Sequence, residues 1–269
     1  MNLLQSIIYG FVSGLSEFMP TSSRGHQQIL LQLFGCQKDP LMDLFVHMTL
    51  LASLYFGARN LVDAFMRERR IAIRRSRNTV ANHSYIYPFI RTASIALVLV
   101  YVLLTYTCPS EYSFLNLALF CLINGILLFI PDRMIQGNKT LQHMSVLDSV
   151  LMGTAGALSV FPGFSRIGVA NAYVVGRGAD RQQAFNWVIL LSFPAVALLI
   201  LLDIIALFAG NLSITFMKVL GYLLAVISSY IGGYLSVSLT RFLAVKIGFS
   251  AFSYYAWGMA LFAFVLYLI

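Results

Sequence analysis

Residues 17–26 read Glu-Phe-Met-Pro-Thr-Ser-Ser-Arg-Gly-His, so a carboxylate, adjacent serines, a guanidinium and an imidazole fall within ten positions. Apolar sequence flanks this stretch on both sides. Ionisable groups at membrane depth are energetically costly, and where they occur they usually mark a function. The stretch therefore predicts a polar break in a membrane-embedded helix, placed at a functional site.

A second stretch repeats this design about 140 residues later. The first reads Gly-x-x-x-Gly-Leu-Ser-x-Phe from residue 10 and continues into Pro-Thr-Ser-Ser-Arg at 20–24. The second reads Gly-x-x-x-Ala-Leu-Ser-x-Phe from residue 153 and continues into Pro-Gly-Phe-Ser-Arg at 162–166. Both contain the pattern P-x-x-S-R. We interpret the two stretches as halves of one composite site.

The composition predicts an integral membrane protein. Of 269 residues, 59% are hydrophobic and 10% are charged, whereas a soluble domain carries about 25% charged residues. Apolar runs near 20 residues long, without strand-like alternation, favour helical spans over a β-barrel. The sequence predicts six spans, at residues 41–58, 85–107, 112–131, 184–207, 213–236 and 248–269.

Two further regions are apolar but interrupted. Residues 1–35 break at 20–25, and residues 146–176 break at 162–163 and at Gly168. Each piece is too short to cross a hydrocarbon core of about 30 Å. Such backbone is tolerated at membrane depth where it is buried in protein or lines a cavity. We therefore predict two re-entrant helical hairpins.

Basic residues set the expected orientation. The polar stretch 59–84, predicted as a loop, holds seven arginines and two acidic residues. If it is cytoplasmic, 13 of the 18 basic residues lie in cytoplasmic loops, as the positive-inside rule requires. The net charge of +8 then needs no nucleic acid. The hairpins enter from opposite faces, which predicts one membrane domain, 1–269, with inverted repeats at about 1–131 and 146–269.

The two breaks are candidate anion sites. Ser and Gly before a new helix can leave backbone N–H groups free, and the helix dipole favours an anion there. Arg24 and Arg166 add guanidinium groups suited to phosphate. We expect Ser22, Arg24, Gly163 and Ser165 to bind substrate. The alternative is a Pro/Gly hinge in which each arginine pairs with a carboxylate.

The first break also carries candidates for proton transfer and nucleophilic attack. Glu17 and His26 flank it, and Ser23 lies at the break beside the charged groups, where a nucleophile can be activated. Alternatively, Glu17 only neutralises Arg24 or Arg166.

Two other features have open interpretations. Asp43 and His47 lie four residues apart on one helix face and are either a supporting pair near the outer end of the cavity or a pair that satisfies itself. Cys36 and Cys108 are expected on the outer face, where they could form a disulfide or remain unrelated thiols.

At these residues the sequence resembles a known family, the undecaprenyl-diphosphate phosphatases, or bacitracin-resistance membrane phosphatases. The resemblance rests on Gly-Leu-Ser-Glu-Phe-Met-Pro-Thr-Ser-Ser-Arg-Gly-His at 14–26 and Pro-Gly-Phe-Ser-Arg-x-Gly at 162–168, and it covers essentially the whole chain. It implies an enzyme of the bacterial inner membrane that hydrolyses undecaprenyl diphosphate to the monophosphate at the outer face, which recycles the lipid carrier of cell-wall synthesis. The expected partners are this lipid and membrane lipids, with no nucleic acid and with a homodimer left open.

The resemblance also implies roles for single residues. Ser23 matches the nucleophile, His26 its proton-transfer partner, and Arg166 the phosphate-binding arginine, which Ser165 precedes. Glu17 matches a motif glutamate, and a divalent cation such as Mg²⁺ or Ca²⁺ is implied beside it.

Three positions depart from the family pattern. Ser13 stands at the first of two usual glutamates, Arg24 at a small hydroxyl residue, and Ile167 at a serine. A lost carboxylate and a gained cation argue against an unchanged metal site. Either Arg24 replaces the cation by neutralising phosphate directly, or catalysis is lost and the protein binds or transports a polyprenyl phosphate.

Overall fold

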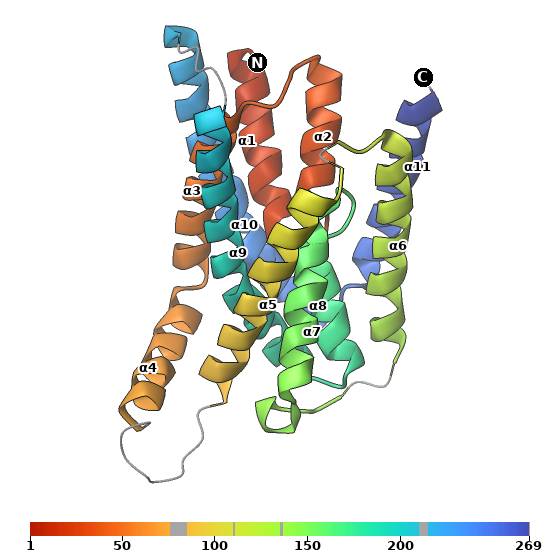
Figure 1. Ribbon diagram of the computed structural model, residues 1–269. Coiled ribbons are helices and arrows are strands. Elements are labelled where there is room, and N and C mark those ends of the chain that lie inside the picture. Colours follow the sequence, from red (N-terminus) through yellow and green to blue (C-terminus); the bar gives the residue numbers. More distant parts are fainter. Residues whose placement is uncertain (76–84, 110, 135–136, 210–214, 269) are drawn as a thin grey trace.

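The computed structural model describes residues 1–75, 85–109, 111–134, 137–209 and 215–268. These residues form eleven α-helices and two short 3-10 helices, and they contain no β-strand. Six of the helices are long and apolar enough to cross a membrane, which confirms an all-α membrane fold. They are α3 (Pro40–Gly57), α5 (Ile86–Thr107), α6 (Phe114–Arg133), α9 (Arg181–Ala209), α10 (Phe216–Lys246) and α11 (Ser250–Leu268) (Figure 1).

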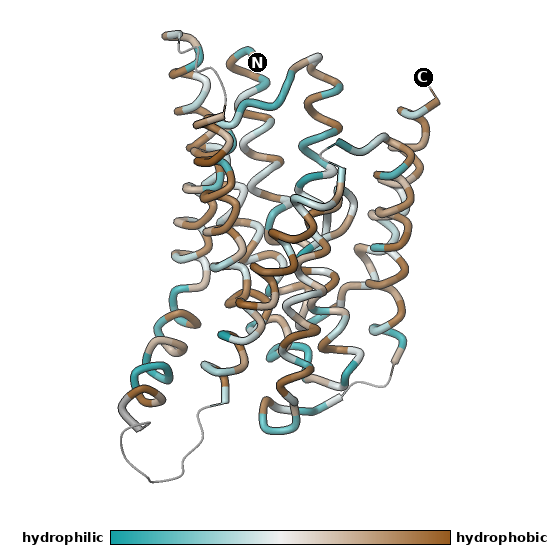
Figure 2. The backbone as a smooth tube through the Cα atoms, viewed as in Figure 1, coloured by the Kyte–Doolittle hydropathy of each residue, from teal (hydrophilic) through white to brown (hydrophobic). Residues whose placement is uncertain are grey.

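The surface of the long helices suits a lipid environment. Figure 2 shows hydrophobic residues along these helices and hydrophilic residues gathered on α4 (Arg59–Arg75). Large apolar side chains such as Leu99, Phe208 and Leu261 are exposed. Contiguous exposed apolar surface marks contact with a membrane or a partner, so these side chains fit the predicted spans.

The loop predicted at 59–84 is wrong for its first part, because residues 59–75 form helix α4. Arginine, methionine, glutamate and alanine are good helix formers. Leu61 and Phe65 of α4 also pack against the hydrophobic core, which stabilises a helix whose other face is basic. Residues 76–84 lie outside the described part of the chain.

Four shorter helices form two pairs, each interrupted as predicted. Helices α1 (Leu3–Glu17) and α2 (Ser23–Phe34) are separated by residues 18–22. Helix α7 (Val146–Ala157) continues into a 3-10 turn, η2 (Leu158–Val160), before the break that precedes α8 (Arg166–Gly176). In Figure 1 the α1–α2 pair comes from the end that carries both chain termini, and the α7–α8 pair comes from the other end.

The helices that follow the two breaks begin with the same type of N-cap. Ser22 Oγ accepts a hydrogen bond from the Gly25 N–H at 3.1 Å, and Ser165 Oγ accepts one from the Gly168 N–H at 3.1 Å. The equivalent positions therefore lie 143 residues apart, and the shared pattern is S-x-x-G. The predicted P-x-x-S-R pairing is out of register by one residue, and Gly168 lies inside α8 rather than at an interruption.

The helices of the two halves pack crosswise. Helix α1 packs against α10, and α7 packs against α5. In each case the first arm of a pair contacts the second span of the other half. Helices α3 and α9 contact each other, as do α6 and α11. Cys36 and Cys108 are both free thiols, so the disulfide alternative is wrong.

Candidate active site at the junction of the two breaks

Hydrogen bonds between side chains and backbone groups join the two breaks directly. The N–H of Gly163 donates to Ser22 Oγ at 2.7 Å, and Ser165 Oγ donates to the carbonyl of Met19 at 3.0 Å. The N–H of Ser165 donates to Asn124 Oδ1 at 3.0 Å. Two halves of the chain therefore form one structure, as the sequence predicted. The predicted anion donors of Gly163 and Ser165 are engaged within the protein.

Charged side chains cross the same junction. Arg166 Nη2 donates to Glu17 Oε1 at 2.7 Å, and both residues are buried, at 6% and 8% exposure. Arg24 Nη1 donates to the carbonyl of Val160 at 3.0 Å, so it binds the second break rather than a carboxylate. The sequence left open whether Glu17 neutralises Arg24 or Arg166, and in the structure Glu17 pairs with Arg166.

A small cavity of about 30 Å³ lies between these groups. Its polar lining comprises Glu17, Thr21, Ser23, Arg24, Tyr101, Ser159 and Arg166. Within the described residues, Ser23 Oγ, Tyr101 OH and Arg166 Nε are buried without a hydrogen-bond partner. Buried polar groups are normally paired, and unpaired ones call for an explanation. Three such atoms lining one cavity indicate a site that receives a polar ligand.

The charges around the cavity favour an anion. Arg24 and Arg166 face it with Glu17 as the one acidic residue in its lining. Because Glu17 compensates one guanidinium, one positive charge remains in a water-poor environment where electrostatic interactions are strong. A phosphoryl group, with several acceptor oxygens and negative charge, matches this combination of donors.

His26 lies on the other side of the first break. Its Nδ1 is 2.6 Å from the carbonyl of Ser22, and its Nε2 is 2.5 Å from the Tyr255 hydroxyl on α11. Since a carbonyl only accepts, Nδ1 carries a hydrogen, and Nε2 of the neutral ring accepts from Tyr255. His26 does not line the cavity that contains Ser23. The structure therefore does not bring these two predicted partners together.

The polar groups at the cavity do not fit a divalent cation. Mg²⁺ and Ca²⁺ take several oxygen ligands, but the lining offers the single carboxylate of Glu17, which already binds Arg166. Ser13, where the resemblance implies a glutamate, accepts a hydrogen bond from Gln27 at 3.2 Å. The described part of the chain contains no group of three His, Cys, Asp or Glu residues that could hold a metal.

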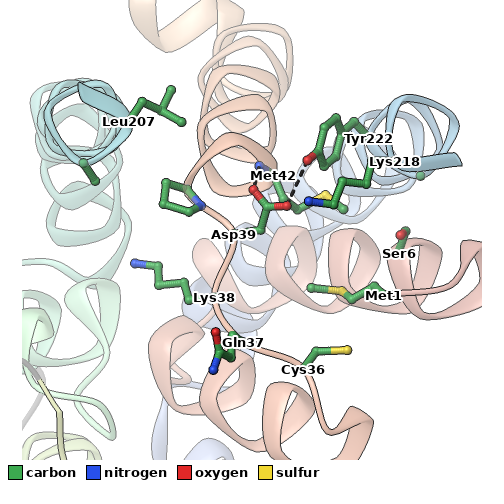
Figure 3. A pocket seen from close by; sticks show the side chains of 13 residues that line it. Met1, Ser6, Cys36, Gln37, Lys38, Asp39, Met42, Leu207, Lys218 and Tyr222 are labelled. Carbon is green, nitrogen blue, oxygen red and sulfur yellow. Dashed lines mark hydrogen bonds between the residues drawn. The ribbon is translucent and has the colours of Figure 1, made fainter. Parts of the chain in front are cut away.

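A second polar cluster lies at the end of the bundle where the chain starts. It includes a cavity of about 510 Å³, and Figure 3 shows Lys38, Asp39 and Tyr222 around it. Tyr222 donates to Asp39 Oδ2 at 2.9 Å. Lys38 pairs with Asp43 at 3.4 Å, and Tyr9 donates to Asp43 Oδ1 at 2.6 Å. This cluster stabilises the packing of α1, α3 and α10.

Asp43 and His47 do not satisfy each other, so that alternative is wrong. His47 Nδ1 pairs instead with Asp203 of α9 at 2.5 Å. Sequence analysis missed Asp203, although an acidic residue inside a predicted span is itself a signal. Neither Asp43 nor His47 lines the cavity between the breaks.

Replacing Gly163 by alanine tests the junction. Gly163 has φ +115°, and an added Cβ would lie 2.6 Å from Phe120 Cβ. We expect an unfolding free energy lower by about 2–4 kcal/mol, from backbone strain and overpacking. Gly176→Ala is the matched control, because no atom lies within 4 Å of its added Cβ. Thermal unfolding in detergent measures both, and equal stability of the two variants would contradict a closely packed junction.

Comparison with known proteins finds matches over nearly the whole chain. A family model described as "Bacitracin resistance protein BacA" matches residues 6–262. A protein of Carboxydothermus hydrogenoformans is 27% identical over 263 residues, covering 96% of this chain and 94% of its own. A protein of Treponema denticola is 30% identical over 258 residues, covering 95% and 93%. One of Methanobrevibacter smithii is 28% identical over 276 residues, covering 98% of each. All three are named undecaprenyl-diphosphatase.

Proposed function

Because the chain belongs to the bacitracin resistance protein BacA family, we propose that it hydrolyses undecaprenyl diphosphate to the monophosphate. The observation that carries this proposal is the cavity between the two breaks. It combines two guanidinium groups, one carboxylate and an unpartnered serine hydroxyl. Phosphoryl transfer needs a positioned nucleophile and stabilisation of charge on the equatorial oxygens, and this lining offers both.

In the proposed reaction, Ser23 Oγ or a water in its place attacks the terminal phosphorus. The bond from that phosphorus to the bridging oxygen breaks, and the monophosphate leaves with this oxygen. Glu17 lines the same cavity and takes the proton of the nucleophile. Arg24 and Arg166 neutralise the phosphoryl oxygens. When Ser23 is the nucleophile, water hydrolyses the phosphoserine, which releases phosphate and restores the hydroxyl.

His26 takes part after a rearrangement. Its Nε2 accepts from Tyr255, so its ring must leave Tyr255 before it can exchange a proton with Ser23. The hydrogen bond from Tyr255 of α11 therefore determines when His26 can exchange a proton. A cavity of about 30 Å³ holds only a water or two, so substrate binding itself requires the surrounding side chains to move.

We propose that Arg24 takes the place of a divalent cation. Its guanidinium lies on the cavity where Glu17 is the one carboxylate, and a fixed positive charge can stabilise a phosphoryl group without a metal. The enzyme would then work without Mg²⁺ or Ca²⁺.

We further infer an inverted repeat in which α1–α2 and α7–α8 are re-entrant hairpins of one domain. The constant offset of 143 residues between equivalent cap residues supports this, as does the crosswise packing of α1 on α10 and α7 on α5. The basic helix α4 lies at the end opposite both termini (Figure 1). The positive-inside rule then puts α4 in the cytoplasm and the termini outside the bacterial inner membrane, where the site would open to recycle the carrier lipid.

One assay tests the proposed function. Purified full-length protein in detergent is given undecaprenyl diphosphate with and without a chelator, and phosphate release is measured for the wild type and for Ser13→Glu. We expect chelator-resistant release by the wild type. Release that disappears with chelator would refute the role of Arg24 as a cation substitute. No release under any condition would refute hydrolysis.

The alternative is a transporter of a polyprenyl phosphate. The observation that favours it is the meeting of two helix breaks that come from opposite ends of the bundle (Figure 1), an arrangement typical of secondary transporters. Translocation of the lipid across proteoliposomes without phosphate release is its distinguishing result.

A further inference from the structure

Tyr101 belongs to no motif, yet its hydroxyl lies at the cavity between the breaks. The residue comes from the C-terminal third of α5 and is 3% exposed. Its ring lies under the Arg24 guanidinium, 5.3 Å from the guanidinium carbon to the ring centroid. Its hydroxyl has no hydrogen-bond partner within the described residues. Phenylalanine at this position would fill the same space without burying a hydroxyl that has no partner.

The Tyr101 hydroxyl contrasts with that of a second buried tyrosine, which does have a hydrogen-bond partner. Tyr9 on α1 is 1% exposed, and its hydroxyl donates to Asp43 Oδ1 at 2.6 Å. A buried hydroxyl without a partner carries an uncompensated desolvation cost. Buried serine and threonine hydroxyls can turn to a carbonyl of their own helix, but a tyrosine hydroxyl is too far from its backbone to do so. The cost at Tyr101 therefore needs an external partner.

We propose that the Tyr101 hydroxyl is a substrate-binding group that donates a hydrogen bond to an oxygen of the terminal phosphoryl group. This inference rests on the proposed function, because it names a further contact of the same site. The hydroxyl shares the cavity lining with Ser23 and Arg166, whose Oγ and Nε atoms are also buried and find no hydrogen-bond partner among the residues that the structure describes. These three groups come from α2, α5 and α8, and a phosphoryl group offers enough oxygens to accept from all of them.

The neighbouring arginine explains how the hydroxyl is held. Arg24 binds the carbonyl of Val160 through Nη1 and covers the Tyr101 ring. A cation over an aromatic face restricts both partners, so the ring and the guanidinium are positioned together before a ligand binds. A preorganised donor stabilises charge on a phosphoryl group without having to reorient.

The test is Tyr101→Phe, which removes the hydroxyl and keeps the ring under Arg24. Tyr9→Phe is the matched control, because it removes a paired hydroxyl of similar burial outside the cavity. Both full-length variants are measured in detergent for unfolding temperature, for binding of inorganic diphosphate, and for kcat and KM with undecaprenyl diphosphate. We expect Tyr101→Phe to unfold at the wild-type temperature or above it, and to bind diphosphate roughly 10- to 100-fold more weakly. Tyr9→Phe should unfold at a lower temperature with unchanged diphosphate binding.

The outcomes separate this inference from the proposed function. Wild-type protein that binds diphosphate but releases no phosphate refutes hydrolysis, while weaker binding by Tyr101→Phe still supports the contact. Equal diphosphate binding by wild type and Tyr101→Phe overturns the contact, whatever the release assay shows. The contact is also overturned if Tyr101→Phe is destabilised as much as Tyr9→Phe with no change in binding, or if the wild type binds no diphosphate.

Discussion

Replacing Arg166 by alanine is expected to lower phosphate release by at least about 10³-fold, the range found for arginines that stabilise phosphoryl transfer. The change removes the guanidinium from the cavity and leaves the buried Glu17 carboxylate without its partner at 2.7 Å. An unpaired buried charge costs about 3–5 kcal/mol, so the unfolding temperature should fall as well. Initial rates at several substrate concentrations, with thermal unfolding of the same samples, measure both effects.

Two further variants separate catalysis from folding in this experiment. Arg166→Lys keeps the positive charge beside Glu17 but lacks the planar donor arrangement of arginine, so it should retain most of the stability and little of the activity. Arg177→Ala is the control at the end of the same helix, where the arginine pairs with Asp148 at 2.7 Å and does not line the cavity. Full activity in Arg166→Ala would refute the proposed site.

The second large effect is expected at Arg24, one of three residues that differ from what the resemblance implies. Arg24→Ala should reduce release at least about 100-fold, because the phosphoryl charge loses one of its two guanidinium partners. Added Mg²⁺ should not restore activity, since Ser13 leaves Glu17 without a second carboxylate. Phosphate release is measured with chelator and then over a series of Mg²⁺ concentrations.

A double variant that adds a carboxylate and removes the Arg24 guanidinium tests the same prediction in the opposite direction. The double variant Ser13→Glu, Arg24→Thr gives both positions the kind of residue that the resemblance implies, and we expect its residual activity to depend on Mg²⁺. Arg133→Ala is the matched control, because Arg133 also stacks on an aromatic ring, with its guanidinium carbon 4.7 Å from the Phe129 centroid, but lies outside the cavity. Wild-type activity in Arg24→Ala with chelator present would show that Arg24 does not replace a cation.

The spans and the breaks were predictable from sequence for a simple physical reason. A hydrocarbon core demands about 20 consecutive apolar residues, and the boundaries of α3 and α5 differ from the prediction by at most one residue. Helix α10 instead continues ten residues beyond the predicted end at 236, to Lys246. The sequence predicts a loop where helix α4 lies, because a run of charged residues between two spans is typical of a loop. Its helix-forming arginines and the packing of Leu61 and Phe65 outweigh that charge.

The site was predictable only in part, because its contacts cross between distant segments. The motif residues Glu17, Ser23, Arg24 and Arg166 do meet at one cavity. Tyr101 was missed because an aromatic residue in a span looks the same whether it faces lipid or a ligand. The partner of His26, Tyr255, lies 229 residues away, and no local pattern points to it.

The junction between the breaks has a consequence for how the protein is made. Four of its hydrogen bonds join residues 136 to 149 positions apart, so none of these can form until residues 160–166 have been translated, after the three spans α3, α5 and α6. Domains generally fold in the order of synthesis, but here α1 and α2 are made before the later residues that bind Glu17 and Arg24, which are Arg166 and Val160. The site is therefore complete only after residues 146–176 have been synthesised and have packed against the first break.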